Sequence, residues 1–227
     1  IEERLVGSEM CIRDRIYVMD IVAFGETKLV GEKRASYFLS KKLDYNYIDC
    51  TSNDTGPQGI FRNTTKYITS NTDPFLAIIG WSNPYSLELR KFYNRTEVTG
   101  FIDENYFSYN AKYKKLPTDF SRLKRFDNIL FDHHLCNNRW TTIAFSLQQT
   151  LESLNIPYMM YNIDHSIEWN GYTMRILREI NRRRYIGVEN PKANVIKYLK
   201  KRGLKFDTNE GQKHLANLIS EKLGKIK

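Results

Sequence analysis

The sequence predicts an α/β fold, a three-layer α/β/α sandwich built around a parallel sheet. Three short apolar runs carry this prediction, at residues 16–24, 74–80 and 156–163. Runs of this length and composition are typical of strands that are buried on both faces of a parallel sheet. Segments with helical spacing separate the runs, and strands that alternate with helices pair in parallel through right-handed crossovers.

The other elements follow from local patterns. Glycine ends the first and third apolar runs, and Asn, Asp, Gly and Pro residues mark a loop after the second strand. An apolar stripe indicates one long helix. Residues 84–118 are rich in Tyr, Asn and Lys without a clear period. In chain order, we expect a helix over 29–43, a strand over 45–50, a loop over 51–59, a helix over 60–70, an irregular aromatic-rich insertion over 84–118, a helix over 120–154 and helices over 193–202 and 210–223.

The first residues do not fit this pattern. The stretch LVGSEMCIRDR, at residues 5–15, matches a reading frame through the transposon end sequence that is used to prepare DNA sequencing libraries. We therefore interpret residues 1–15 as an artefactual extension and exclude them from the fold. Residues 16–227 are then expected to form a single domain, since about two hundred residues suffice for one hydrophobic core.

Bulk composition narrows the class of protein. A hydrophobic content of 41% and an aromatic content of 13% fit a globular protein. No apolar run approaches about 18 residues, so we expect no membrane-spanning helix. Outside the extension only Cys50 and Cys136 remain, too few for a disulfide framework. With no signal peptide seen, these features predict a cytoplasmic protein.

The formal net charge of +9 is concentrated near the C-terminal end. From Met174 to Lys227 there are 15 Lys or Arg residues against 5 Asp or Glu residues. Arg182, Arg183 and Arg184 form the densest run. Such a region attracts nucleic acid or another polyanion, and it is also typical of a solvated surface that keeps a protein soluble.

The predicted topology selects the loops where a site is expected. In open parallel sheets, ligands bind outside the carboxyl ends of the strands. The segments after the first three strands are AFGETKLVG (23–31), SNDTGPQGIFRNT (52–64) and GWSN (80–83), and FDTNEGQKHLANLI (206–219) contains the last helix. Gly25 and Gly80 are expected to lie side by side at the same edge, so that Thr27 and Asn83 face a common pocket.

These segments, in this order, resemble the conserved blocks of the SGNH (GDSL-type) hydrolase superfamily, most closely the SGNH-like proteins of tailed phages and marine metagenomes. The segment LQQTLESLNIPYMMYNI (147–163) also fits the family. The resemblance extends over nearly the whole chain from Val18 onward. It implies a flavodoxin-like sandwich with about five parallel strands and an ancestral activity on esters or O-acetyl groups, including those of carbohydrates.

The resemblance also implies a role for each matching residue. Thr27 stands at the nucleophile position, and Asn83 at that of an oxyanion donor. Ser52 or Asn53 is placed to supply the second-block donor, and Gly25 and Gly80 belong to the first and third blocks. Asp207 and His214 are the candidates for proton acceptor or orienting group.

Two departures from the family pattern weaken the expected catalysis. The nucleophile is threonine instead of serine, and its β-branch restricts rotation and crowds an incoming carbonyl group. The family's final block is Asp-x-x-His-Pro with a glycine five residues after the histidine. Counting back from Gly211 reaches Phe206, or Asp207 after one deletion, and neither side chain replaces an imidazole near neutral pH.

Several alternatives stay open. The protein is either a weak esterase, a relative that has lost catalysis, or a binding module that uses Arg182–Arg184 on a polyanion. Fold analogy alone also allows a virion or host-interaction role. The aromatic insertion suits either stacking on carbohydrate or packing as a lid. His133 and Cys136 lie three residues apart, but structural zinc draws four ligands with paired spacings, so we expect neither a metal nor a cofactor.

Overall fold

The computed structural model describes residues 19–25, 34–51, 56–81, 86–90, 106–110, 133–163, 171–187 and 194–225. Five of its strands form one parallel sheet in the order β2-β1-β3-β6-β7. These strands are β1 (Asp20–Gly25), β2 (Tyr47–Asp49), β3 (Phe75–Trp81), β6 (Tyr158–Asn162) and β7 (Tyr185–Ile186). The predicted parallel sheet of about five strands is therefore confirmed.

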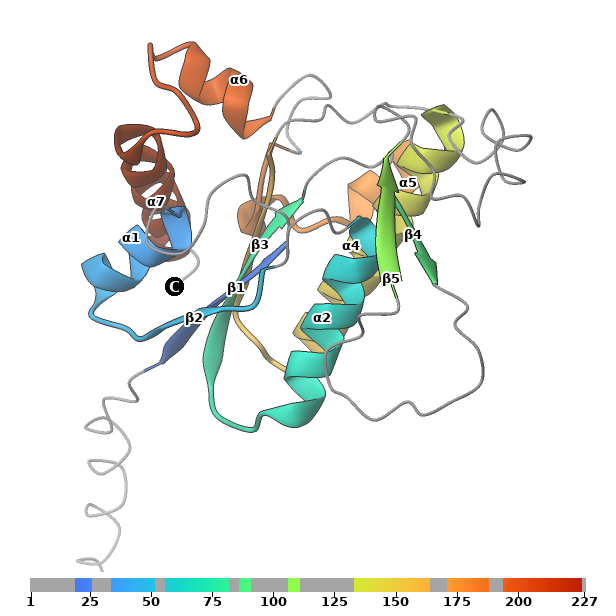
Figure 1. Ribbon diagram of the computed structural model, residues 1–227, viewed down its shortest axis with the longest axis horizontal. Helices are drawn as coiled ribbons and strands as arrows, with labels where there is room; N and C mark the ends of the chain where they lie inside the picture. The colour runs from blue at the N-terminus through green and yellow to red at the C-terminus, as the bar shows by residue number, and fades with distance from the viewer. Residues whose placement is uncertain are drawn as a thin grey trace, which may run out of the picture.

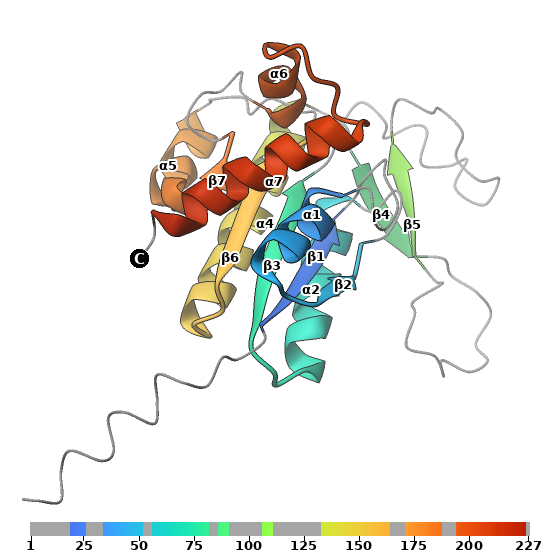
Figure 2. The same ribbon diagram turned by 90° about the vertical axis from the view of Figure 1, so that its left-hand side faces the viewer.

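Helices cover both faces of the sheet (Figure 1). One face carries α2 (Pro57–Ser70), α4 (His133–Ser153) and α5 (Gly171–Glu179). The other carries α1 (Ala35–Leu43), α6 (Val195–Lys200) and α7 (Asn209–Gly224), and Figure 2 shows α1 and α7 side by side over it. This arrangement is the three-layer α/β/α sandwich that the sequence predicts.

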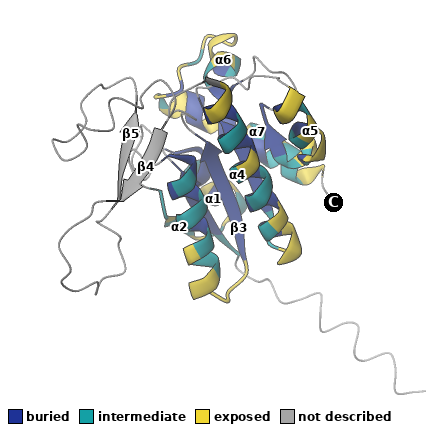
Figure 3. Cartoon of the chain, turned by 90° about the vertical axis from the view of Figure 1, so that its right-hand side faces the viewer, coloured by how far each residue is buried: buried dark blue, intermediate teal, exposed yellow. Residues whose placement is uncertain are grey.

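Two hydrophobic cores, one on each face, hold the layers together. Every residue of β1 from Ile21 to Gly25 is buried, and so is all of β3. Because successive side chains of a strand point to opposite faces, each central strand contributes to both cores. The helices bury only their inward faces and expose the outward ones (Figure 3). Trp140, Ala144, Leu147 and Leu151 are fully buried on α4, as the predicted stripe requires.

Local chemistry sets the ends of several helices. Helix α2 begins at Pro57, three residues before the expected start, because proline has a fixed φ and no N–H to leave unpaired at a first helical position. The Thr208 hydroxyl caps α7 by accepting from the Gly211 N–H at 3.2 Å. The Asn194 side chain caps α6 by accepting from the Lys197 N–H at 2.8 Å.

Two expectations require correction. The insertion at 84–118 is not wholly irregular, because it contains the antiparallel strands β4 (Ser86–Arg90) and β5 (Tyr106–Asn110), which lie beside α2 (Figure 1). Of the long helix expected over 120–154, residues 120–132 lie outside the described residues, and the described part begins at His133. The sequence patterns did not predict helix α5, the 3₁₀ turn η4 (Arg182–Arg184) or strand β7. Strand β7 has only two residues, which are too few to show a period.

No helix within the described ranges has both the length and the apolar composition needed to cross a membrane.

Candidate functional site

The carboxyl ends of β1 and β3 meet at one edge of the sheet. Gly25 is the direct register partner of Gly80, as expected from the sequence. The strand order reverses between β1 and β3, because β2 lies on one side of β1 and β3 on the other. Such a topological switch point is where parallel sheets bind ligands.

Glycine is required at the end of β1. Gly25 has a φ of +105°, and a β-carbon there would lie 2.1 Å from the carbonyl oxygen of Gly80. A β-carbon added to Gly80 would in turn lie 3.0 Å from the hydroxyl oxygen of Tyr161. The two glycines thus allow β1, β3 and the Tyr161 ring to approach closely at this edge.

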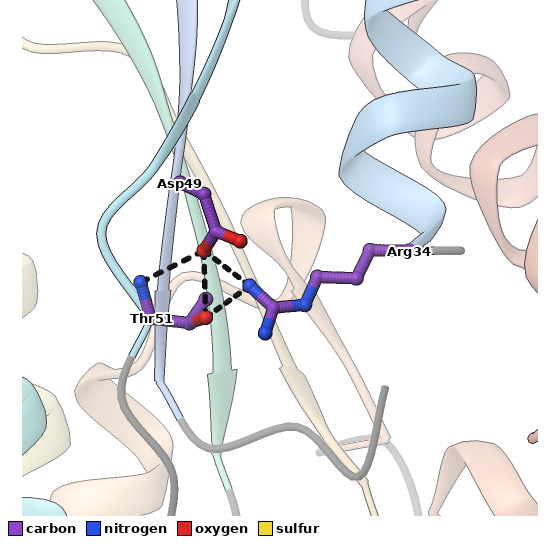
Figure 4. A network of polar contacts seen from close by, with 3 residues as sticks. All are labelled: Arg34, Asp49 and Thr51. Atoms are coloured by element: carbon purple, nitrogen blue, oxygen red, sulfur yellow. Dashed lines mark hydrogen bonds and ion pairs between the residues drawn. The ribbon is translucent and has the colours of Figure 1, made fainter. Parts of the chain in front are cut away.

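The end of β2 joins this edge through a polar network (Figure 4). The Arg34 guanidinium, directly before α1, forms an ion pair with Asp49 and a hydrogen bond to the Thr51 hydroxyl. Asp49 Oδ1 also accepts from the Thr51 hydroxyl at 2.6 Å and from the Thr51 N–H at 3.1 Å. The Arg34 side chain is only 7% exposed, so the network connects β2 to the start of α1 from inside the protein.

Two tyrosines lie near this network. Burial raises the pKa of Tyr161, while the nearby positive charge of Arg34 acts in the opposite direction. Burial also raises the pKa of Tyr47. Both phenols therefore stay protonated at neutral pH and can act as hydrogen-bond donors.

The segment before α7 is held at the same edge by Gln212. Its Oε1 accepts from the Ala35 N–H at 2.8 Å, and its Nε2 donates to the Phe206 carbonyl oxygen at 2.5 Å. Gln212 is 2% exposed, so this amide is a buried bridge between the first turn of α1 and the turn that precedes α7. These contacts thus connect the end of β2, the start of α1 and the turn before α7.

Removing the Gln212 bridge is expected to destabilise the protein. In Gln212→Met, a side chain of similar length leaves the Ala35 N–H and the Phe206 carbonyl without these partners. We expect a loss of about 2 kcal/mol in the free energy of unfolding, measured by urea denaturation. Glu221→Met, at an exposed position of the same helix, is the control and should change it by less than about 0.5 kcal/mol. Equal effects of the two substitutions would contradict the bridging role.

The predicted site residues fall into two groups. Thr27, Ser52, Asn53 and Asn83 lie outside the described residues. Gly25 and Gly80 lie in register at the edge, as described above. Asp207 is exposed in the turn before α7, whereas Phe206 is 8% exposed and packs into the core beside that helix.

His214 is directed toward α6. Its ring lies 5.9 Å from the Tyr198 ring, centroid to centroid, with the two planes tilted by 33°. Gln212, two residues earlier, contacts the start of α1 instead. Residues two apart in a helix leave it on nearly opposite sides, so His214 and Gln212 point to different neighbours.

Sequence reasoning missed Arg34, Asp49, Thr51, Tyr161 and Gln212. Asp49 lies near the end of the second predicted strand and Thr51 follows it directly, so a carboxylate and a hydroxyl at a strand end were a usable signal. No local pattern distinguishes Arg34 or Gln212 from the other polar residues near them in the sequence. Their contacts join positions 15 and 177 residues apart, which only the fold determines.

The Cys50 thiol, at the end of β2, is not an activated nucleophile. Burial, and to a smaller extent the neighbouring charge of Asp49, raises its pKa to about 11. The reactive form of cysteine is the thiolate, which is scarce at neutral pH when the pKa is this high. The described residues contain no group of three or more His, Cys, Asp or Glu side chains arranged to hold a metal ion.

The basic run predicted to bind polyanions lies at the opposite side of the sheet from β2. Arg182 and Arg183 are exposed in η4, while Arg184 lies over the Tyr158 ring at 5.1 Å. The Lys222 ammonium group donates to the carbonyl oxygens of Arg182 and Tyr185, at 3.3 and 3.1 Å, and so fixes this turn to α7.

Comparison with known proteins gives a likeness in structure. No protein-family model matches the chain, and no curated protein matches its sequence. The fold is similar to the solved structure of a G-D-S-L family protein, described as lipolytic, from Desulfitobacterium hafniense DCB-2. The identity is 11% and the TM-score 0.44, over 90% of this chain and 99% of that one. This similarity is too low to support an assignment. The fold class is established instead by the strand order and the layers of this structure.

Proposed function

We propose that this chain is an SGNH-hydrolase-like protein that binds small esters or O-acetylated carbohydrates at the carboxyl edge of its sheet and hydrolyses them slowly. The pairing of Gly25 with Gly80 at the switch point is the observation that supports this most directly. It brings together the ends of the two strands that precede Thr27 and Asn83 in the sequence. The order of the sequence blocks gives independent support.

The proposed roles follow the chemistry of acyl transfer. Thr27 attacks the ester carbonyl through its hydroxyl, and the Asn83 amide stabilises the oxyanion that forms. The alcohol then leaves with the transferred proton, and water hydrolyses the acyl-threonine to release acetate and restore the hydroxyl. Asp207 is preferred to His214 as the proton acceptor, because His214 packs on Tyr198 of α6. A carboxylate is a weaker base than imidazole near neutral pH, and general base catalysis contributes about 10²–10⁴-fold in rate. Slow turnover is the expected consequence.

The test is acetate release from p-nitrophenyl acetate and from an O-acetylated methyl glucoside. We expect slow hydrolysis by the wild-type protein, faster hydrolysis by Thr27→Ser, and a rate indistinguishable from buffer for Thr27→Ala. The double variant Arg182→Gln/Arg183→Gln, altered in the basic turn, is the control and should keep the wild-type rate. Wild-type hydrolysis no faster than in buffer, or equal rates for wild type and Thr27→Ala, would refute the proposed activity.

A further inference from the structure

Two residues with buried N–H donors are paired at the carboxyl ends of β3 and β6. Trp81 and Asn162 are register partners on these strands, and both are 0% exposed. Within the part of the chain that the structure describes, Trp81 Nε1 and Asn162 Nδ2 have no hydrogen-bond partner. Register partners in a parallel pair project from the same face of the sheet, so the two side chains lie next to each other on one face.

The surroundings fix how Asn162 is oriented. Its Oδ1 accepts a hydrogen bond from the Tyr185 hydroxyl at 2.6 Å, which leaves the amide N–H₂ as the group without a partner. Burial raises the pKa of Tyr185, so its hydroxyl remains a donor at neutral pH. The choice between the two ends of the amide is therefore determined by the neighbouring strand.

Aromatic rings pack against the Trp81 ring and against Tyr185, the partner of Asn162. Trp140 meets Trp81 edge-to-face with centroids 6.3 Å apart, and it meets Tyr185 in the same way at 6.4 Å. A buried donor without a partner costs about 1–3 kcal/mol, so a pair of them at a candidate binding edge calls for an explanation. A ligand that supplies an acceptor oxygen would recover this cost on binding.

We infer that Trp81 and Asn162 form a subsite that receives the acetyl group of the ligand, with its carbonyl oxygen accepting from both N–H groups. Indole and amide donors are neutral, and desolvating an anion among aromatic rings is costly, so an uncharged acceptor fits best. The methyl part of an acetyl group packs on the rings. This assignment rests on the proposed function for the choice of an acetylated ligand, but it does not require hydrolysis.

The experiment observes the indole N–H of Trp81 directly by ¹H–¹⁵N NMR. The chain has three tryptophans, so the resonance can be assigned individually. The protein carries Thr27→Ala to prevent turnover, and it is titrated with methyl 6-O-acetylglucoside and, as the matched control ligand, methyl glucoside. We expect a saturable downfield shift of the Trp81 indole proton with the acetylated ligand alone.

Two donor-removing variants and one control complete the test. Trp81→Phe removes the indole donor, and Asn162→Leu/Tyr185→Phe removes the amide donor together with the hydroxyl that pairs with it. Each is expected to weaken binding of the acetylated ligand about tenfold. Tyr158→Phe, which removes a hydroxyl at the other end of β6, should leave the affinity unchanged. The double variant keeps the test valid if Trp81→Phe does not fold.

The outcomes separate this inference from the proposed hydrolysis. A specific shift without any turnover by the wild type would support the subsite and refute the esterase activity. Turnover that depends on Thr27, with no shift beyond that given by methyl glucoside, would overturn the subsite and leave the activity standing. Unchanged affinity in the folded donor variants would also overturn it, and would indicate that the two N–H groups are satisfied by bound water.

Discussion

Replacing Gly25 with alanine is expected to lower the free energy of unfolding by about 4 kcal/mol, because steric overlap and backbone strain act together. The added β-carbon would lie 2.1 Å from the Gly80 carbonyl oxygen, a backbone atom of a fully buried strand that cannot move alone. The φ of +105° is in addition unfavourable for any residue with a β-carbon. Urea denaturation followed by circular dichroism measures the change.

Gly203→Ala separates the two contributions. Gly203 also has a positive φ, of +72°, but a β-carbon there would meet no atom within 4 Å. This variant should therefore show the cost of backbone strain alone, about 1 kcal/mol. If Gly25→Ala were no more destabilising than Gly203→Ala, the result would contradict the close approach of β1 to β3 at this edge.

Replacing Asp49 with alanine is expected to cost about 3 kcal/mol in the free energy of unfolding, near the lower limit for breaking a buried ion pair. Arg34 is almost fully buried and would lose the carboxylate that neutralises it, while Thr51 would lose an acceptor. The Asp49 side chain is 30% exposed, and solvent reaching it limits the effect. Thermal and urea unfolding measure the loss.

The same substitution at an exposed aspartate is the control. Asp73→Ala, in the turn before β3, should change the free energy of unfolding by less than about 0.5 kcal/mol. In a double-mutant cycle, Arg34→Met should cost less in the Asp49→Ala background than in the wild type. Additive costs would show that the two side chains do not stabilise each other.

The fold was largely predictable because its central strands are distinctive. The runs that form β1, β3 and β6 are short, apolar and bounded by glycine, asparagine or proline. A strand that is buried on both faces has apolar residues at successive positions, so it appears in the sequence as a continuous apolar run. β7 escaped prediction because two residues contain no period. β4 does alternate polar residues with leucine, over only five residues, whereas the aromatic and polar residues of β5 follow no simple alternation.

The candidate site was predictable only in outline. Glycines that end two strands pointed correctly to one edge, since parallel strands direct their carboxyl ends the same way. The contacts that organise this edge did not follow from local sequence. The Arg34–Asp49 pair, the Gln212 bridge and the Trp81–Asn162 donors each join segments that are distant along the chain.

By itself, the sequence determined the class of fold, the order of its central elements and the edge at which a site is expected. These depend on periodicity and on glycine, which act over a few neighbouring residues. Only the tertiary structure decided which polar groups are buried together at that edge, that His214 packs against α6, and that Arg34 and Gln212 connect the loops. Such pairings depend on strand register and helix rotation, which the whole core sets collectively.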